Sequence, residues 1–144
     1  MRDAKGWQTA QGRRQLARLA DVLIPGDGEL PSATAAEVPG KWVDRVLETR
    51  ADLGSELTRS LEETTALGAE DGIAWLALHD PDGLLVLKYV LASGYLMNPR
   101  VREILHYPGP RANPALPDEA EFDLRDGILE PVKARGSIYR KVDF

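Results

Sequence analysis

The sequence predicts a mainly α-helical protein, a compact bundle of five to six helices over residues 1–110 with an extended, largely irregular C-terminal arm over residues 111–144. Apolar residues recur at helical spacing in the first part of the chain. Clusters of proline and glycine separate these segments, and no stretch shows the sustained alternation of a strand. An apolar content of 43 % in 144 residues is enough for one modest core.

The first helix is expected over residues 9–24. Leu16, Leu19 and Leu23 fall on one face of this segment, which makes it amphipathic. Pro25 and the glycines after it end the helix, because proline disfavours a helical residue before it.

Two further helices and a short apolar segment are expected between Pro39 and Leu78. Pro39 can occupy the first turn of a second helix, where its missing N–H is not needed. A third helix is expected over residues 54–67, with Gly68 as its C-terminal stop. Residues 73–78 are apolar and predict one or two helical turns.

The most apolar helix is expected over residues 83–95, with Asp80 as its N-cap and Pro81 at its first position. Its apolar residues lie on nearly all sides, which indicates a helix buried by its neighbours or partly covered by another chain. Asn98 caps a last short helix, which residues 106–110 stop.

The C-terminal arm shows no sustained period, and a structureless stretch of this length is unusual inside a compact domain. It is either disordered or extended over another surface. Its spaced apolar residues favour contact with a partner subunit, through Phe122, Ile138, Tyr139 and Phe144.

Composition excludes several classes of function. A net charge of −5 argues against sequence-independent binding of nucleic acid, which requires Lys and Arg on the phosphates. The chain has no cysteine, which removes disulfides, thiolate nucleophiles and Cys-ligated metal centres. Residues 1–10 are polar and no run approaches the ~20 apolar residues of a membrane span, so we expect a cytoplasmic protein without direct membrane insertion.

No convincing catalytic, cofactor-binding or metal-binding residues emerge. The two histidines, His79 and His106, lack partners at metal-ligand spacing. His79 beside Asp80 is either a proton-transfer pair or a helix entry with Asp80 as the cap, and the second interpretation is preferred. The remaining candidates are aromatic residues suited to contact with a partner, or alternatively to the core: Trp7 in the polar N-terminal segment, Tyr95, Tyr107 and the adjoining Pro108.

Three segments together resemble the gluconate 2-dehydrogenase subunit 3 family. They are residues 19–27 (LADVLIPGD), the loop of residues 31–38 with the Val43-Asp44 helix after it, and residues 94–110. The last segment contains Gly94-Tyr95, Asn98-Pro99 and the turn Tyr107-Pro108-Gly109-Pro110. His106 departs from the family pattern, because it stands where the first glycine of this turn is expected.

This resemblance implies a non-catalytic, chaperone-like small subunit that binds and stabilises a large oxidoreductase of the glucose–methanol–choline type. The large subunit would carry FAD and oxidise a sugar or alcohol, often with a cytochrome subunit as electron acceptor. Many members of the family are exported to the periplasm with a twin-arginine signal. Here Arg13-Arg14 precedes an amphipathic helix, so a periplasmic location requires a signal that was removed or one on the partner.

Two other functions stay open. One is a free-standing helical adaptor module that binds other proteins. The other is a small hydrolase or isomerase that uses His79 and Asp80.

Overall fold

The computed structural model describes residues 6–110, 112, 125 and 127–136. The chain separates into two units, Met1–Gly109 and Pro110–Phe144. The prediction of a mainly α fold is confirmed. Among the described residues the extended pairing is limited to one bridge between Asp27 and Leu30.

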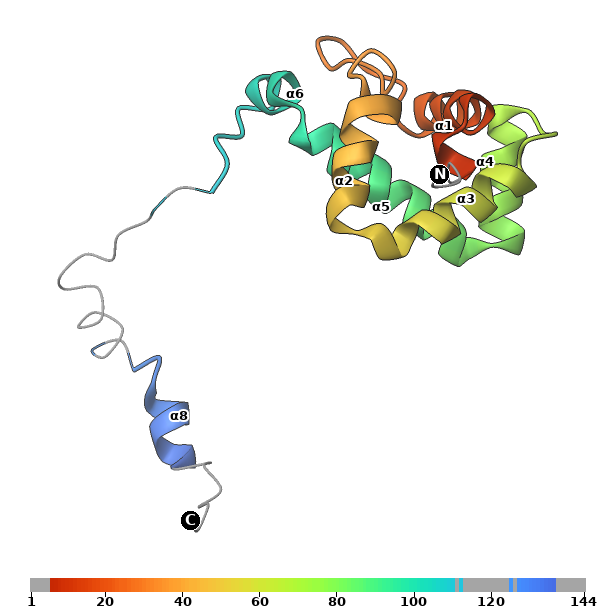
Figure 1. Cartoon of the computed structure of the whole chain (residues 1–144). Helices are drawn as coiled ribbons and strands as arrows, with labels where there is room; N and C mark the ends of the chain where they lie inside the picture. Colours follow the sequence, from red (N-terminus) through yellow and green to blue (C-terminus); the bar gives the residue numbers. More distant parts are fainter. Residues whose placement is uncertain (1–5, 111, 113–124, 126, 137–144) are drawn as a thin grey trace. The chain divides into compact units, whose positions relative to one another are not determined.

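The first unit is built from α-helices joined mostly by short turns, with one longer loop over residues 24–37 (Figure 1). Its helices are α1 (Ala10–Leu23), α2 (Val43–Thr49), α3 (Gly54–Glu63), α4 (Ala69–His79), α5 (Pro81–Met97) and α6 (Pro99–Ile104). Single helical turns precede α1, α2 and α3: η1 (Gly6–Gln8), η2 (Val38–Trp42) and η3 (Ala51–Leu53). The second unit contains α8 (Glu130–Arg135).

Helix α5 is the central element of the first unit and packs against α2, α3, α4, α6 and η2. Its inner side chains, among them Leu87, Val90 and Leu91, are fully buried. They share one apolar cluster with Leu16 and Leu19 of α1. The amphipathic α1 therefore buries the face that its sequence period predicts.

Side-chain caps fix where three helices begin. Thr9 Oγ1 accepts a 3.0 Å hydrogen bond from Gly12 N at the start of α1. Asp80 accepts one of 3.1 Å from Gly83 N and caps α5. Asn98 accepts one of 2.9 Å from Arg100 N and caps α6, so the two caps predicted from the sequence are confirmed.

The region around Gly68 differs from the sequence prediction. Gly68 is the N-cap of α4 rather than the end of α3, which already stops at Glu63. Thr64 follows α3 directly, and its hydroxyl donates a 2.8 Å bond back to Ser60 O. Helix α4 is 11 residues long and exceeds the predicted one or two turns. Its apolar residues are not confined to one face, so no amphipathic period marked its full length in the sequence.

The loop between α1 and η2 is held at three points. The Asp21 carboxylate accepts from Thr34 N at 2.8 Å and from the Thr34 hydroxyl. Tyr95 Oη donates to Pro31 O at 2.7 Å, and Asn98 Nδ2 donates to Ala36 O at 2.9 Å. These bonds attach the loop to both α1 and the end of α5.

The described part of the second unit contains a helix that the sequence prediction did not include. Pro131 stands near the start of α8, and Gly136 follows its end with φ 70°. Lys133 Nζ lies 3.0 Å from Glu130 Oε1. These are ordinary start and stop signals, overlooked because the helix has only 6 residues.

None of the helices in the described ranges combines the length and the apolar character needed to cross a membrane.

Candidate partner-binding surface

Trp7 is a core residue in this structure, so of the two alternatives that the sequence left open its burial favours the core. Its side chain is 4 % exposed, and the Arg13 guanidinium lies 4.7 Å from the centre of its ring. The turn η1 can approach α1 this closely because position 12 is glycine. A Cβ at Gly12 would lie 2.1 Å from the carbonyl oxygen of Gly6. The residues around Trp7 in the sequence are polar, so they give no indication that Trp7 is buried.

Tyr95 is also largely buried and acts mainly inside the first unit. Its hydroxyl fastens the loop at Pro31 to α5, and burial raises the pKa of the Tyr95 phenol. The edge of its side chain lines a surface hollow beside Leu30.

Tyr107 and Pro108 are exposed, in the turn that follows α6. The Tyr107 side chain is 53 % exposed, and Leu105 close by is exposed as well. Tyr107 N donates a 2.8 Å bond to Arg102 O, which closes the turn against α6. The backbone at His106 is left-handed, with φ 51°. This turn is therefore anchored to α6 and presents an aromatic side chain outward.

The four predicted contacts in the C-terminal arm, Phe122, Ile138, Tyr139 and Phe144, lie outside the described residues.

The outer side of α5 carries apolar side chains that the sequence analysis did not single out. Leu85, Tyr89 and Leu96 are 65 %, 46 % and 50 % exposed, and Ala92 between them is exposed too. Their spacing of four, three and four residues places them along one side of the helix. We call this set the α5 stripe. The sequence did show that this helix is apolar on nearly all sides. That pattern alone could not tell which of its residues face the core and which face outward.

Helix α4 also exposes apolar surface. Leu78 is 77 % exposed, the largest value among the exposed large apolar residues described. Trp75 is partly buried, and the His79 ring stacks on it with centroids 4.9 Å apart. Both α4 and α5 thus carry apolar residues on the side that their neighbours leave open.

His79 and Asp80 face different partners. Nδ1 of His79 lies 3.0 Å from the Trp75 carbonyl oxygen. The Asp80 carboxylate binds Gly83 N and Arg59 Nη2, each at 3.1 Å. Asp80 therefore serves as the cap that was expected from the sequence.

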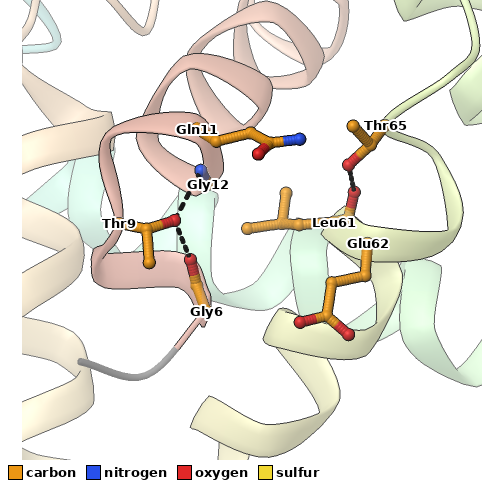
Figure 2. Close-up of a pocket in the computed structure, with 7 residues that line it drawn as sticks. All are labelled: Gly6, Thr9, Gln11, Gly12, Leu61, Glu62 and Thr65. Atoms are coloured by element: carbon orange, nitrogen blue, oxygen red, sulfur yellow. Dashed lines mark hydrogen bonds between the residues drawn. The ribbon is translucent and has the colours of Figure 1, made fainter. Parts of the chain in front are cut away.

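A hollow of about 260 Å³ lies between the start of α1 and the end of α3 (Figure 2). Its hydroxyl groups are already bonded to the backbone, Thr9 to Gly6 O and Thr65 to Leu61 O, both at 2.7 Å. Glu62 and Gln11 complete its polar lining. This arrangement brings no base next to a nucleophile. In the described ranges, no three His, Asp or Glu side chains group closely enough to hold a metal ion.

Comparisons with protein families, with curated proteins and with solved structures found no match to this chain.

Proposed function

We propose that this chain is a non-catalytic small subunit that binds and stabilises the large FAD-dependent subunit of a sugar or alcohol dehydrogenase. The observation that carries the proposal is the α5 stripe, because exposed apolar side chains aligned along one helix are typical of a protein-binding surface. The resemblance of residues 19–38 and 94–110 to the gluconate 2-dehydrogenase subunit 3 family names the kind of partner.

The physical role of such a subunit requires no chemistry of its own. Apolar surface that is buried between two chains stabilises the folded form of both by mass action. The stripe offers Leu85, Tyr89 and Leu96 for this purpose. The turn at Tyr107 adds a second exposed aromatic group on a backbone that is fixed by hydrogen bonds, so little conformational entropy is lost when it binds.

Co-expression with a large FAD-binding oxidoreductase of the glucose–methanol–choline type from the same organism tests the proposal. We expect this chain to co-elute in size exclusion with a yellow, FAD-loaded partner that is insoluble or colourless when expressed alone. A lone monomer beside an equally soluble and fully active flavoprotein would contradict the proposal and favour an adaptor module.

A further inference from the structure

Asp27 and Gly28 lie in a tight turn of the loop that follows α1. Asp27 N donates to Leu30 O at 3.0 Å, and Leu30 N donates to Asp27 O at 2.9 Å, so these two residues close the turn. Gly28 has φ 56°, whereas φ of Glu29 is not positive. A positive φ at the first central residue alone corresponds to a type II′ turn, which favours glycine at that position.

The groups that could react with each other in this dipeptide are exposed and unbonded. Asp27 and Gly28 are both exposed to solvent. Within the described part of the chain, neither the Asp27 carboxylate nor the Gly28 N–H has a hydrogen-bond or ion-pair partner. A Cβ placed on Gly28 would meet nothing within 4 Å, so the space around this residue is open.

Two other Asp-Gly pairs, residues 71–72 and 82–83, lie inside α4 and α5 and provide an internal comparison. In both pairs the aspartate is exposed, but the glycine is buried and its N–H donates a hydrogen bond. These bonds run from Gly72 N to Gly68 O at 2.8 Å and from Gly83 N to Asp80 Oδ1 at 3.1 Å. The three pairs therefore share a sequence and differ in whether the glycine nitrogen is free. A fourth pair, residues 126–127, is not wholly within the described residues.

We propose that Asp27 is a site of spontaneous aspartate isomerisation, a covalent modification for which water is the only co-reactant. The Gly28 nitrogen attacks Cγ of Asp27 and forms a C–N bond. The nitrogen loses its proton and the carboxyl group loses its hydroxyl, which leave together as one water and give a cyclic succinimide. Water then adds to either ring carbonyl. Cleavage of the new bond restores aspartate, and cleavage of the original peptide bond gives isoaspartate.

Isoaspartate at position 27 changes the loop without changing its charge. The main chain then runs through Cβ and Cγ of residue 27 and is longer by one CH₂ group, while the former main-chain carbonyl becomes the free carboxylate. Asp27 O, which accepts the bond from Leu30 N, thereby leaves the main chain. The modification thus opens the turn in the loop that Tyr95 fastens at Pro31.

Peptide mapping of the full chain by mass spectrometry tests the proposal. The folded chain is kept at neutral pH and physiological temperature, and samples taken over time are digested with trypsin. The tryptic peptide of residues 19–41 contains the exposed pair, and that of residues 60–88 contains both helical pairs. We expect peptide 19–41 to divide into two forms of equal mass. The new form should resist a protease that cleaves before aspartate at position 27, and should accept a methyl group from an isoaspartyl methyltransferase.

The helical pairs should isomerise at least about tenfold more slowly, because the helix must first open locally. A factor of ten corresponds to an opening free energy of about 1.4 kcal/mol. In urea the three glycine amides are equally free, so the three pairs should isomerise at similar rates. Incubation continues until the sample in urea has reacted, which shows that the assay detects the product.

Two matched variants complete the test. Asp27→Glu keeps the charge but requires a larger ring, so peptide 19–41 should remain a single form. Asp71→Glu, the same change in a helical pair, should leave the reaction at Asp27 unaltered. The proposal is overturned if the folded chain forms no isoaspartate at Asp27, if all three pairs react equally fast in the folded chain, or if peptide 19–41 still divides in Asp27→Glu.

Discussion

The carboxylate of Asp80 links the end of α4, the start of α5 and the side of α3. It accepts hydrogen bonds from Gly83 N and Arg59 Nη2 and lies in reach of the Ser60 hydroxyl at 3.5 Å. Burial raises the pKa of Asp80, but the hydrogen bonds from Arg59 and Gly83 outweigh it, so the pKa lies below its usual value. The fold therefore favours the charged carboxylate.

Replacing Asp80 with alanine should destabilise the first unit measurably. Loss of an N-cap costs about 1 kcal/mol, and a buried Ser60 hydroxyl without its acceptor raises the total to about 1–3 kcal/mol. The exposed Arg59 adds little, because water screens its charge. Thermal unfolding followed by circular dichroism should show a midpoint lower by several degrees. The control is Asp82→Asn, which removes a charge from the same helical turn without removing the cap.

The pH dependence gives a sharper test through Asp80→Asn, which retains a capping oxygen but loses the charge. Because the pKa of Asp80 is lowered by folding, its charge contributes stability above the ordinary carboxyl pKa of about 4. That contribution is lost as the pH falls through the lower pKa of the folded state. The difference in stability between wild type and Asp80→Asn should therefore be greatest near neutral pH and should shrink as the solution is made acidic. A difference that is constant with pH, or an Asp80→Ala midpoint equal to that of wild type, would refute this reasoning.

Three further predictions concern the core and the loop. Leu87→Ala should lower the free energy of unfolding by about 2–5 kcal/mol, measured in urea, because Leu87 is fully buried. Exposed Leu85→Ala, its control, should change this energy far less. Tyr95→Phe should cost about 0.5–1.5 kcal/mol at neutral pH, since Pro31 O loses its donor. Folding raises the pKa of Tyr95 above its ordinary value of 10.0. Wild type should therefore lose stability as the pH rises from that ordinary value through the higher pKa of the folded state, and Tyr95→Phe should lose less. Asn98→Ala should cost about 1–3 kcal/mol by removing a cap and leaving Ala36 O unpaired. Hydrogen exchange should then show faster opening of the loop, and unchanged exchange there would contradict the assigned tether.

The sequence predicted those parts of the fold that depend on local chemistry. The amphipathic period of α1 and the capping residues Asp80 and Asn98 act within a few residues, so they can be read directly. The boundary between α3 and α4 could not be read this way. Gly68 suits the end of one helix as well as the start of the next, and close packing between distant residues, such as that of Gly72 beside Leu19 and Thr64, is not visible in a local pattern.

The candidate surface was predictable only in part. Tyr107 is exposed as its proline-rich turn suggests, whereas Trp7 is buried through a close contact at Gly12 that no local pattern reveals. The α5 stripe was missed for a different reason. A helix that is apolar on all sides does not indicate which side meets the core, and only the packing of its neighbours leaves Leu85 and Leu96 outside.

The turn that presents Tyr107 contains a conformational cost that can be measured. His106 adopts φ 51°, a region that costs a residue with a side chain about 1–2 kcal/mol and costs glycine little. His106→Gly should therefore stabilise the first unit by up to about 1 kcal/mol, after allowance for the greater freedom of glycine in the unfolded chain. His106→Val should destabilise it, since a β-branched residue fits this region poorly.

The matched control for His106→Gly is Glu103→Gly, at an exposed helical position of α6, where glycine should cost about 1 kcal/mol. Urea unfolding of the three variants gives the comparison. Opposite signs for glycine at positions 106 and 103 would support a left-handed backbone at His106, and with it the fixed presentation of Tyr107. An equal loss at both positions would mean that residue 106 adopts an ordinary conformation in solution. The rigidity attributed to this turn in partner binding would then rest on the hydrogen bond from Tyr107 N to Arg102 O alone.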